Sequence, residues 1–311
     1  MEKIKTAKHT IFIGSRGSQL ALIQTREVLS ELEKANPEIK FELTTIKTSG
    51  DQHKSPLQNP ITGEGIFVKE IEDALFSSRI DLAVHSLKDL PTKIPTGLCL
   101  AAVTKRLDPR DVIISNSGNF SQLAANSTIG TSSPRRISQL LAYRPDLKIK
   151  QLRGNIGTRL RKVKEGEVSG IIIAAAGIIR LGLEDMITEY LSTELFLPAV
   201  GQAALGLESR EGDGEIATLV SPLNHKPTWQ CISAERAFLH TLGGGCHTPV
   251  GALATLDGDT IRLQGIVASS DGSRVLRDAE EGNQPEDVGK RLALRMLKMG
   301  ASELITKAET R

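Results

Sequence analysis

The residue whose setting most suggests chemistry is Cys246, which follows three consecutive glycines at residues 243–245. Glycines leave the thiol on an open loop, whereas a structural cysteine usually packs inside a strand or helix. A tight backbone turn could by itself require the glycines. We interpret Cys246 as a reactive or covalently modified thiol, and we expect Cys99 and Cys231, in apolar or helical surroundings, to be inert.

A second candidate is the loop at residues 85–92, which follows an expected strand at residues 81–84. Lys88 and Asp89 place an ammonium group beside a carboxylate, and such a carboxylate can stabilise a cationic intermediate or transfer protons. Adjacent Lys and Asp are also common on surfaces. His85 could be a general base, but it could equally be a buried structural histidine.

The segment 14–18 follows an expected strand and opens an expected helix. It would bring the guanidinium group of Arg16, the hydroxyl of Ser18 and free backbone N–H groups together at a helix N-terminus, where anions bind. A well-capped helix with a surface arginine would give the same pattern, because serine is a common N-cap.

A stronger signal lies at residues 131–136, where three hydroxyl residues precede two arginines in the first turn of a helix. Cations there oppose the helix dipole, so an anion should compensate them. Further arginines follow other expected strands. The whole set is Ser133, Arg135, Arg136, Arg153, Arg159 and Arg180. Each arginine alone fits a solvated face, but together they predict one cleft for a polycarboxylate or polyphosphate, which the planar fork of arginine suits.

The charge distribution supports an anionic ligand. The net charge of the 311 residues is only +2, yet residues 130–182 hold eleven Lys and Arg against three Asp and Glu. Nucleic acid would also be an anion, but aromatic residues make up 3% of the chain and this segment holds only Tyr143. Stacking platforms for bases are therefore missing, and we expect no nucleic-acid partner.

The composition is that of a folded globular chain, with 39% hydrophobic and 24% charged residues. The longest apolar run, residues 171–179, is far shorter than the roughly 20 residues of a membrane span. Residues 1–10 are polar and the apolar stretch 11–13 is too short for a secretory signal. The three cysteines have no zinc-ligand spacing. We therefore expect a cytoplasmic protein with no membrane contact, no bound metal and no disulfide framework.

These candidate sites need elements to position them, and the first hundred residues alternate between strand and helix periods. We expect strands at residues 10–14, 41–46 and 81–84, a helix at 18–35 and a helical apolar stripe at 66–75. This βαβ pattern predicts a parallel sheet. The polar segment 47–64 is too long for a routine connection and suggests either a mobile lid or a disordered loop.

The same pattern repeats farther along the chain, with strands expected at residues 111–115, 127–130, 147–152 and 170–175. Residues 13–15 and 18–20 resemble residues 129–131 and 138–140, a weak sign of duplication. The C-terminal part reads as a small α+β domain with a helix at 229–242, strands at 250–256 and 261–268, and a helix at 285–305.

Taken in this order, the motifs resemble those of the porphobilinogen deaminase family, also called hydroxymethylbilane synthases. The similarity runs nearly end to end. It is carried by residues 13–16, 47–51, 67–70, 84–91, 108–111, 130–136, 152–155, 174–177, 197–202 and 245–246.

The resemblance implies a monomeric transferase that joins four porphobilinogen molecules head to tail, releasing ammonia each time, to give hydroxymethylbilane. Asp89 would be the catalytic carboxylate, and Cys246 would hold a dipyrromethane cofactor through a thioether. By the same resemblance, the cofactor would be bound by Lys88, Asp89, Ser133, Arg135, Arg136 and Arg153. The substrate would be bound by Arg16, Ser18, Arg159 and Arg180.

The resemblance also implies three domains: residues 1–105 with 200–222, residues 106–199, and residues 223–311. The first two would be similar α/β domains like those of periplasmic binding proteins, and the third the smaller α+β domain. Departures from the family pattern are Ala203, where glycine is usual, His247, and a diverged lid at 51–65. A non-catalytic two-lobed binder of a polycarboxylate and an RNA-binding protein remain the alternatives.

Overall fold

The computed structural model describes residues 10–48, 68–245 and 248–309. The chain forms two compact units, one of residues 1–105 and 204–229 and the other of residues 106–203 and 230–311. The expected lid at residues 51–65 lies outside the described residues. The finer division into three domains stays a prediction.

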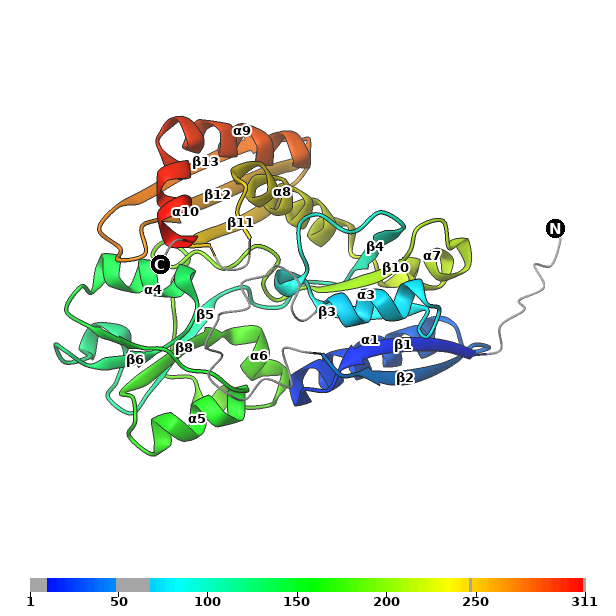
Figure 1. The fold of residues 1–311 in the computed structure, drawn as a ribbon, viewed down its shortest axis with the longest axis horizontal. Helices are drawn as coiled ribbons and strands as arrows, with labels where there is room; N and C mark the ends of the chain where they lie inside the picture. Colours follow the sequence, from blue (N-terminus) through cyan, green and yellow to red (C-terminus); the bar gives the residue numbers. More distant parts are fainter. Residues whose placement is uncertain (1–9, 49–67, 246–247, 310–311) are drawn as a thin grey trace. The chain divides into compact units, whose positions relative to one another are not determined.

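The first unit is built on a five-stranded sheet of order β2-β1-β3-β10-β4 (Figure 1). Its strands are β1 (Thr10–Arg16), β2 (Lys40–Ile46), β3 (Leu82–Ser86), β4 (Leu98–Val103) and β10 (Leu205–Arg210). Its helices are α1 (Gln19–Ala35), α3 (Lys69–Phe76), α7 (Gly214–Val220) and the short 3-10 helices η1 (Leu87–Asp89) and η4 (Ser221–Leu223). The sheet is mixed, because β10 runs antiparallel to both β3 and β4. The three strands expected from the βαβ pattern, β1, β2 and β3, are parallel as predicted, and the departure from a parallel sheet comes from β10.

Both faces of this sheet are covered, as the alternation of side chains along β3 shows. Leu82 and Val84 pack with the buried residues of α1 and α7 on one face. Ala83, between them, packs with the buried residues of α3 on the other. Successive residues of a strand point to opposite faces, so a strand covered on both sides reads as a continuous apolar run.

The second unit contains a five-stranded sheet of order β7-β6-β8-β5-β9. Its strands are β5 (Asp111–Ser115), β6 (Thr128–Gly130), β7 (Lys148–Lys150), β8 (Gly170–Ala174) and β9 (Glu189–Tyr190). The helices around it are α4 (Pro134–Tyr143), α5 (Ile156–Lys164), α6 (Ala175–Arg180), η2 (Phe120–Gln122) and η3 (Glu184–Met186). As in the first unit, the strand beside the three parallel strands is antiparallel to its neighbours: here β5 runs antiparallel to β8 and β9.

The two sheets are built alike. In each sheet one strand, β1 or β6, lies between two strands that run parallel to it. Ile13 of β1 pairs with Leu82, and Ile129 of β6 pairs with Gly170 in the same way. At the next residue, a Cβ on Gly14 or on Gly130 would stand 2.2 Å from the side chain of Ile80 or Leu152, respectively. The matched order, register and glycine confirm the expectation of two similar α/β domains.

The C-terminal part of the second unit is a three-stranded antiparallel sheet of β11 (Val250–Asp257), β12 (Thr260–Ala268) and β13 (Val275–Gly282). The helices α8 (Lys226–Leu242), α9 (Pro285–Lys298) and α10 (Ala301–Glu309) contribute to its core. The expected helix at 285–305 was wrong as one element, because it ends before Gly300, whose φ of +97° is a left-handed conformation. Among the described helices, none is long and apolar enough to cross a membrane.

Candidate active site

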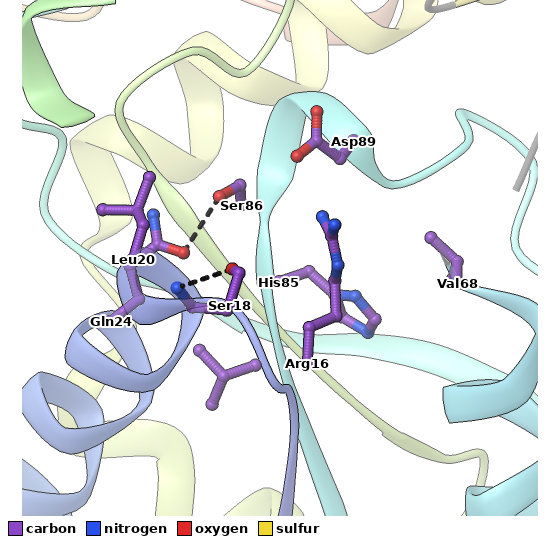
Figure 2. Close-up of a pocket in the computed structure, with 10 residues that line it drawn as sticks. Arg16, Ser18, Leu20, Gln24, Val68, His85, Ser86 and Asp89 are labelled. Atoms are coloured by element: carbon purple, nitrogen blue, oxygen red, sulfur yellow. Dashed lines mark hydrogen bonds between the residues drawn. The ribbon is translucent and has the colours of Figure 1, made fainter. Parts of the chain in front are cut away.

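A pocket lies in the first unit where β1 and β3 end. The two strands are parallel, so their carboxyl ends meet at one edge of the sheet, the usual ligand position in open α/β sheets. Its lining residues are Arg16, Ser18, Leu20, Ala21, Gln24, Val68, Val84, His85, Ser86 and Asp89 (Figure 2). Sequence reasoning placed Arg16, Ser18 and Asp89 apart along the chain, and the structure brings them together.

The N-terminus of α1 forms one wall of this pocket. Ser18 is the N-cap, and its hydroxyl accepts a hydrogen bond from the backbone N–H of Ala21 at 3.3 Å. The first turn of α1 carries no acidic residue, so its positive dipole end stays uncompensated by the helix itself. With the guanidinium of Arg16 beside it, this wall favours an anionic ligand.

Asp89 lies at the end of η1, directly after β3. Leu87 is 1% exposed and Leu90 4%, and these two buried side chains fix the turn while Asp89 stays half-buried between them. In Figure 2 the side chain of Arg16 extends toward Asp89 across the pocket. A carboxylate held this way can stabilise positive charge that develops on a ligand.

His85 lines the same pocket and is buried on its other side. Its Nε2 lies 2.9 Å from Oε2 of Glu208 on β10, and the two side chains are 4% and 0% exposed. Of the two alternatives that the sequence left open, the structure shows a buried histidine with a carboxylate partner, and a role as general base stays a prediction. Sequence reasoning did not find Glu208.

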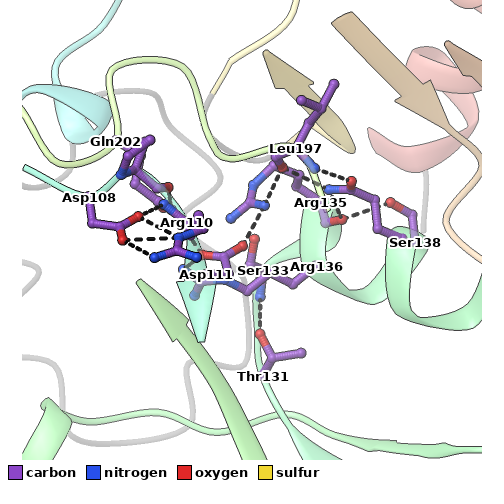
Figure 3. A network of polar contacts seen from close by, with 12 residues as sticks. Asp108, Arg110, Asp111, Thr131, Ser133, Arg135, Arg136, Ser138, Leu197 and Gln202 are labelled. Atoms are coloured by element: carbon purple, nitrogen blue, oxygen red, sulfur yellow. Dashed lines mark hydrogen bonds and ion pairs between the residues drawn. The ribbon is translucent and has the colours of Figure 1, made fainter. Parts of the chain in front are cut away.

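The arginine pair of α4 lies in the second unit, around Asp111 (Figure 3). Asp111 accepts hydrogen bonds from Nη1 of Arg135 at 2.7 Å, Nη2 of Arg136 at 2.8 Å and Nε2 of Gln202 at 2.9 Å. Arg135 also donates to the carbonyl of Leu197 at 2.7 Å. Arg135 and Arg136 are 4% and 6% exposed, so they do not form a solvated face.

This cluster holds more positive than negative charge. Burial alone would raise the pKa of Asp111, but the charges and hydrogen bonds of Arg135 and Arg136 hold that pKa far below its usual range. Burial, together with repulsion from Arg136, lowers the pKa of Arg159. One buried carboxylate thus faces two guanidinium groups, and a third, that of Arg159, is close enough for the charge of Arg136 to affect its pKa.

The remaining predicted residues are spread over their units. Ser133 is the half-buried N-cap of α4, Arg153 is exposed before α5, and Arg180 is half-buried at the end of α6. Lys88 is half-buried in η1 and is not among the pocket residues. The structure therefore joins Arg135, Arg136 and Arg159 by contact or charge, and the binding roles of all these residues stay predictions.

Cys246 and His247 lie outside the described residues, but the loop that leads to them is described. Thr248 closes the loop from the far side, because its hydroxyl donates to the carbonyl of Gly245 at 2.6 Å and its N–H donates to the same oxygen at 3.1 Å. Gly243 has a φ of +71°, which favours glycine. Within the described ranges, no group of three or more His, Cys, Asp or Glu could hold a metal ion.

The residues of the second unit fit a ligand with several carboxylates, such as a dipyrromethane. Nε of Arg135 and Nε of Arg136 are buried with no hydrogen-bond partner among the described residues. Buried guanidinium groups in excess over carboxylates favour further anions.

Sequence reasoning also missed Gln24, Ser86 and Asp111. Ser86 donates to Oε1 of Gln24 at 3.0 Å inside the pocket. Gln24 lies six residues after the N-cap of α1, on its buried face, so helix periodicity could have found it. Asp111 is the first residue of β5, and a search for a counter-ion to the arginines could have found it.

Two similar α/β sheets, a carboxylate in a pocket at a helix N-terminus and a buried arginine cluster are the features of a protein that binds an anionic ligand. The sequence profile described as "Porphobilinogen deaminase, dipyromethane cofactor binding domain" matches residues 11–218, and "Porphobilinogen deaminase, C-terminal domain" matches residues 229–298. The chain belongs to the porphobilinogen deaminase family, whose members are transferases of tetrapyrrole synthesis.

Curated relatives agree along nearly the full length. The chain is 46% identical over 302 residues to the porphobilinogen deaminase of Syntrophomonas wolfei, covering 96% of this chain and 98% of that protein. It is 46% identical over 303 residues to the porphobilinogen deaminase of Bacillus subtilis, covering 96% of each. Membership in this family does not favour the alternatives of a non-catalytic binder or an RNA-binding protein.

Solved structures of binding proteins are similar at a lower level. A putative methionine-binding lipoprotein of Bacillus subtilis matches with a TM-score of 0.43 and 13% identity, covering 70% of this chain and 90% of that one. The periplasmic aliphatic sulphonate binding protein of Escherichia coli matches with a TM-score of 0.40 and 14% identity, covering 76% and 71%.

Proposed function

We propose that this chain joins four porphobilinogen molecules head to tail with release of ammonia, giving hydroxymethylbilane, and that Asp89 is the catalytic carboxylate. The observation that carries this proposal is the position of Asp89 in one pocket with Arg16 and Ser18. Loss of ammonia from an aminomethylpyrrole leaves positive charge on the carbon skeleton. A half-buried carboxylate stabilises such charge more than an exposed one, because solvent screens it less.

Arg16 and Ser18 are proposed to bind the acetate and propionate groups of the substrate, with Arg159 and Arg180 in the second unit. The side chain of Ser18 accepts from the helix backbone, so its own O–H remains able to donate to a carboxylate. The guanidinium groups supply charge-assisted hydrogen bonds, about twice as strong as neutral ones.

A dipyrromethane cofactor is proposed to be held by Ser133, Arg135, Arg136 and Arg153, with Lys88 and Asp89. When bound, it supplies the pyrrole to which the first substrate is joined. Asp111 would fix the orientation of the arginine pair beforehand, so little ordering is needed when the carboxylates arrive.

Cys246 is proposed as the covalent attachment point of that cofactor. Cys231 is a poor alternative, because burial, helped by the nearby Glu235 carboxylate, raises the pKa of its thiol to about 11 and disfavours the thiolate. Cys246→Ser should abolish the adduct, whereas Cys99→Ser and Cys231→Ser should keep it. An adduct that survives in Cys246→Ser would refute the assignment.

We further infer a monomeric, cytoplasmic enzyme without a nucleic-acid partner. Cys99 and Cys231 are free thiols, which fits a reducing compartment. Size-exclusion chromatography with light scattering tests the monomer against the chain mass of 33.6 kDa. A dimeric mass, or retention of nucleic acid that falls with salt, would contradict these points.

The activity itself is tested by incubating the purified chain with porphobilinogen. We expect the release of four ammonia molecules per product and, after the released product is cyclised in acid and oxidised with added iodine, a porphyrin absorption band. Ligand binding with no ammonia release would support a binding protein instead.

A further inference from the structure

The pair of His85 and Glu208 is the feature of the pocket that the proposed roles leave unused. His85 lies on β3 directly opposite Gly206 of β10, and Glu208 lies opposite Ala83. His85 and Glu208 are thus diagonal neighbours across the antiparallel pair of β3 and β10, a separation that long side chains can bridge. The contact at 2.9 Å follows from this register.

His85 is the hydrogen-bond partner that the structure shows for the carboxylate of Glu208 among the described residues. Glu208 is 0% exposed, its Oε2 contacts Nε2 of His85, and its Oε1 has no hydrogen-bond partner among the described residues. A buried carboxylate without a hydrogen-bond donor is costly, and Nε2 of His85 is the group that contacts Oε2. This contact fixes the orientation of the ring.

The second ring nitrogen of His85 is available. Nδ1 makes no hydrogen bond among the described residues, while the side chain lines the pocket that holds Asp89 (Figure 2). A ring oriented by a buried carboxylate, with its other nitrogen uncommitted beside a ligand pocket, is the arrangement of a proton-transfer group.

Charged groups from every neighbouring element act on this ring. They are Arg16 of β1, Glu72 of α3, Glu208 of β10 and Asp89 of η1, while α1 contributes the neutral Gln24. Burial first, and then the carboxylate of Glu208, raises the pKa of Glu72, and His85 opposes this shift. Glu72 therefore lies close enough to His85 and Glu208 for their charges to affect its pKa.

We propose that His85, held by the positioning residue Glu208, is a second catalytic residue that moves the proton of each condensation. The proposal rests on the proposed function. The imidazolium gives its Nδ1 proton to the amino nitrogen as the C–N bond of porphobilinogen breaks, and ammonia leaves. After the new C–C bond forms, the α-carbon of the attacked pyrrole releases its proton to the neutral imidazole, which restores the imidazolium.

In this proposal Asp89 stays negatively charged and stabilises the cationic intermediates, while His85 transfers the proton to the amino nitrogen and takes one up from the α-carbon. Each cycle consumes no net proton at the enzyme, because the proton taken by the leaving amine equals the one lost from the α-carbon. The reaction then needs no exchange with solvent between the two events.

The test compares Glu208→Gln and His85→Gln with Asp81→Asn as the matched control. Asp81 is also a buried carboxylate of this sheet, 1% exposed and paired with Arg210 at 2.9 Å, but it does not line the pocket. The first condensation removes the α-proton of the cofactor's terminal pyrrole, so single-turnover rates are measured on enzyme whose cofactor was assembled from porphobilinogen carrying hydrogen or deuterium at the free α-carbon. Wild type is run first as the check of the proposed function.

We expect His85→Gln to slow condensation by about a hundredfold or more, in keeping with general acid–base catalysis, and to reveal a deuterium isotope effect that wild type lacks or shows weakly. Glu208→Gln should do the same to a smaller extent and change the shape of the pH–rate profile. Asp81→Asn should leave both the isotope effect and the profile shape unchanged. Equal isotope effects and superimposable profiles in wild type and Glu208→Gln would overturn the proposal.

A second measurement does not depend on the variants being active. Nitrogen-15 NMR of the histidine rings should show the Nε2 of His85 in a hydrogen bond in wild type, and Glu208→Gln should change this signal. A His85 signal that Glu208→Gln leaves unchanged would overturn the proposal, whereas absence of porphobilinogen consumption by wild type would overturn the proposed function.

Discussion

Replacing Asp111 by asparagine keeps the shape of the side chain and removes the carboxylate shared by Arg135 and Arg136. In the wild type the two ion pairs are 2.7 and 2.8 Å long, and Asp111 is fully buried. Asn would keep one acceptor oxygen but would leave two buried guanidinium groups without their counter-ion.

The expected loss is large for one substitution. Breaking a buried ion pair by removing one partner costs about 3–5 kcal/mol. A whole domain is typically stable by about 5–15 kcal/mol. We therefore expect Asp111→Asn to lower the free energy of unfolding of the second unit by about 3–5 kcal/mol at neutral pH.

The pH dependence has a defined sign. The pKa of Asp111 in the folded protein lies below its unfolded value of about 3.9. Such a group stabilises the fold above the unfolded pKa, and the contribution disappears as pH falls through the folded pKa. The difference in stability between wild type and Asp111→Asn should thus be constant above about pH 5 and shrink in stronger acid.

Urea unfolding followed by far-ultraviolet circular dichroism measures this difference at several pH values. Asp146→Asn is the control, because Asp146 makes an ion pair with Arg144 at 2.7 Å on the exposed surface, and we expect no measurable change. A stability for Asp111→Asn within 1 kcal/mol of wild type, or a difference that grows in acid, would refute the role of Asp111 as the buried anchor.

Three further predictions follow from the site and the backbone. Asp89→Asn should cut single-turnover ammonia release by about a hundredfold or more on cofactor-loaded enzyme while substrate binding changes little; a near-normal rate would remove Asp89 from the mechanism. Arg153→Leu should weaken cofactor assembly or elongation by about 1.5–3 kcal/mol without lowering the urea midpoint, because Arg153 is exposed; unchanged kinetics would return it to the solvated surface. Ala203→Gly should raise stability by up to about 1 kcal/mol, because Ala203 has a φ of +76°; a lower melting temperature would contradict this strain.

The sequence predicted local elements better than their pairing. The strands that end at Arg16 and Ser86 were expected from their apolar runs, and the pocket followed because parallel strands end at one edge. β10 was missed, since its residues 205–210 pair only with strands more than a hundred positions earlier, and local periodicity carries no information about such partners. β13 was missed because the adjacent charged pairs at residues 277–278 and 280–281 leave no alternation of apolar and polar residues in its sequence.

The candidate site shows the same limit. Asp89 and Arg16 were found by their positions after strands and by the family motif. Glu208 and Asp111 pair with residues that are distant in sequence, His85 for Glu208 and the arginines of α4 for Asp111. The sequence around each carboxylate therefore gives no sign of the pairing. The arginine pair of α4 was expected to await an external anion, and the structure shows that Asp111 already supplies one.

The central claim is that this chain works as a porphobilinogen deaminase through a cofactor on Cys246, and mass spectrometry of the purified protein tests it most directly. We predict an intact mass above that of the bare chain by about two pyrrole units, with the addition mapped to the peptide that contains Cys246. An unmodified chain that stays unmodified after incubation with porphobilinogen, or an adduct on Cys99 or Cys231, would contradict the claim.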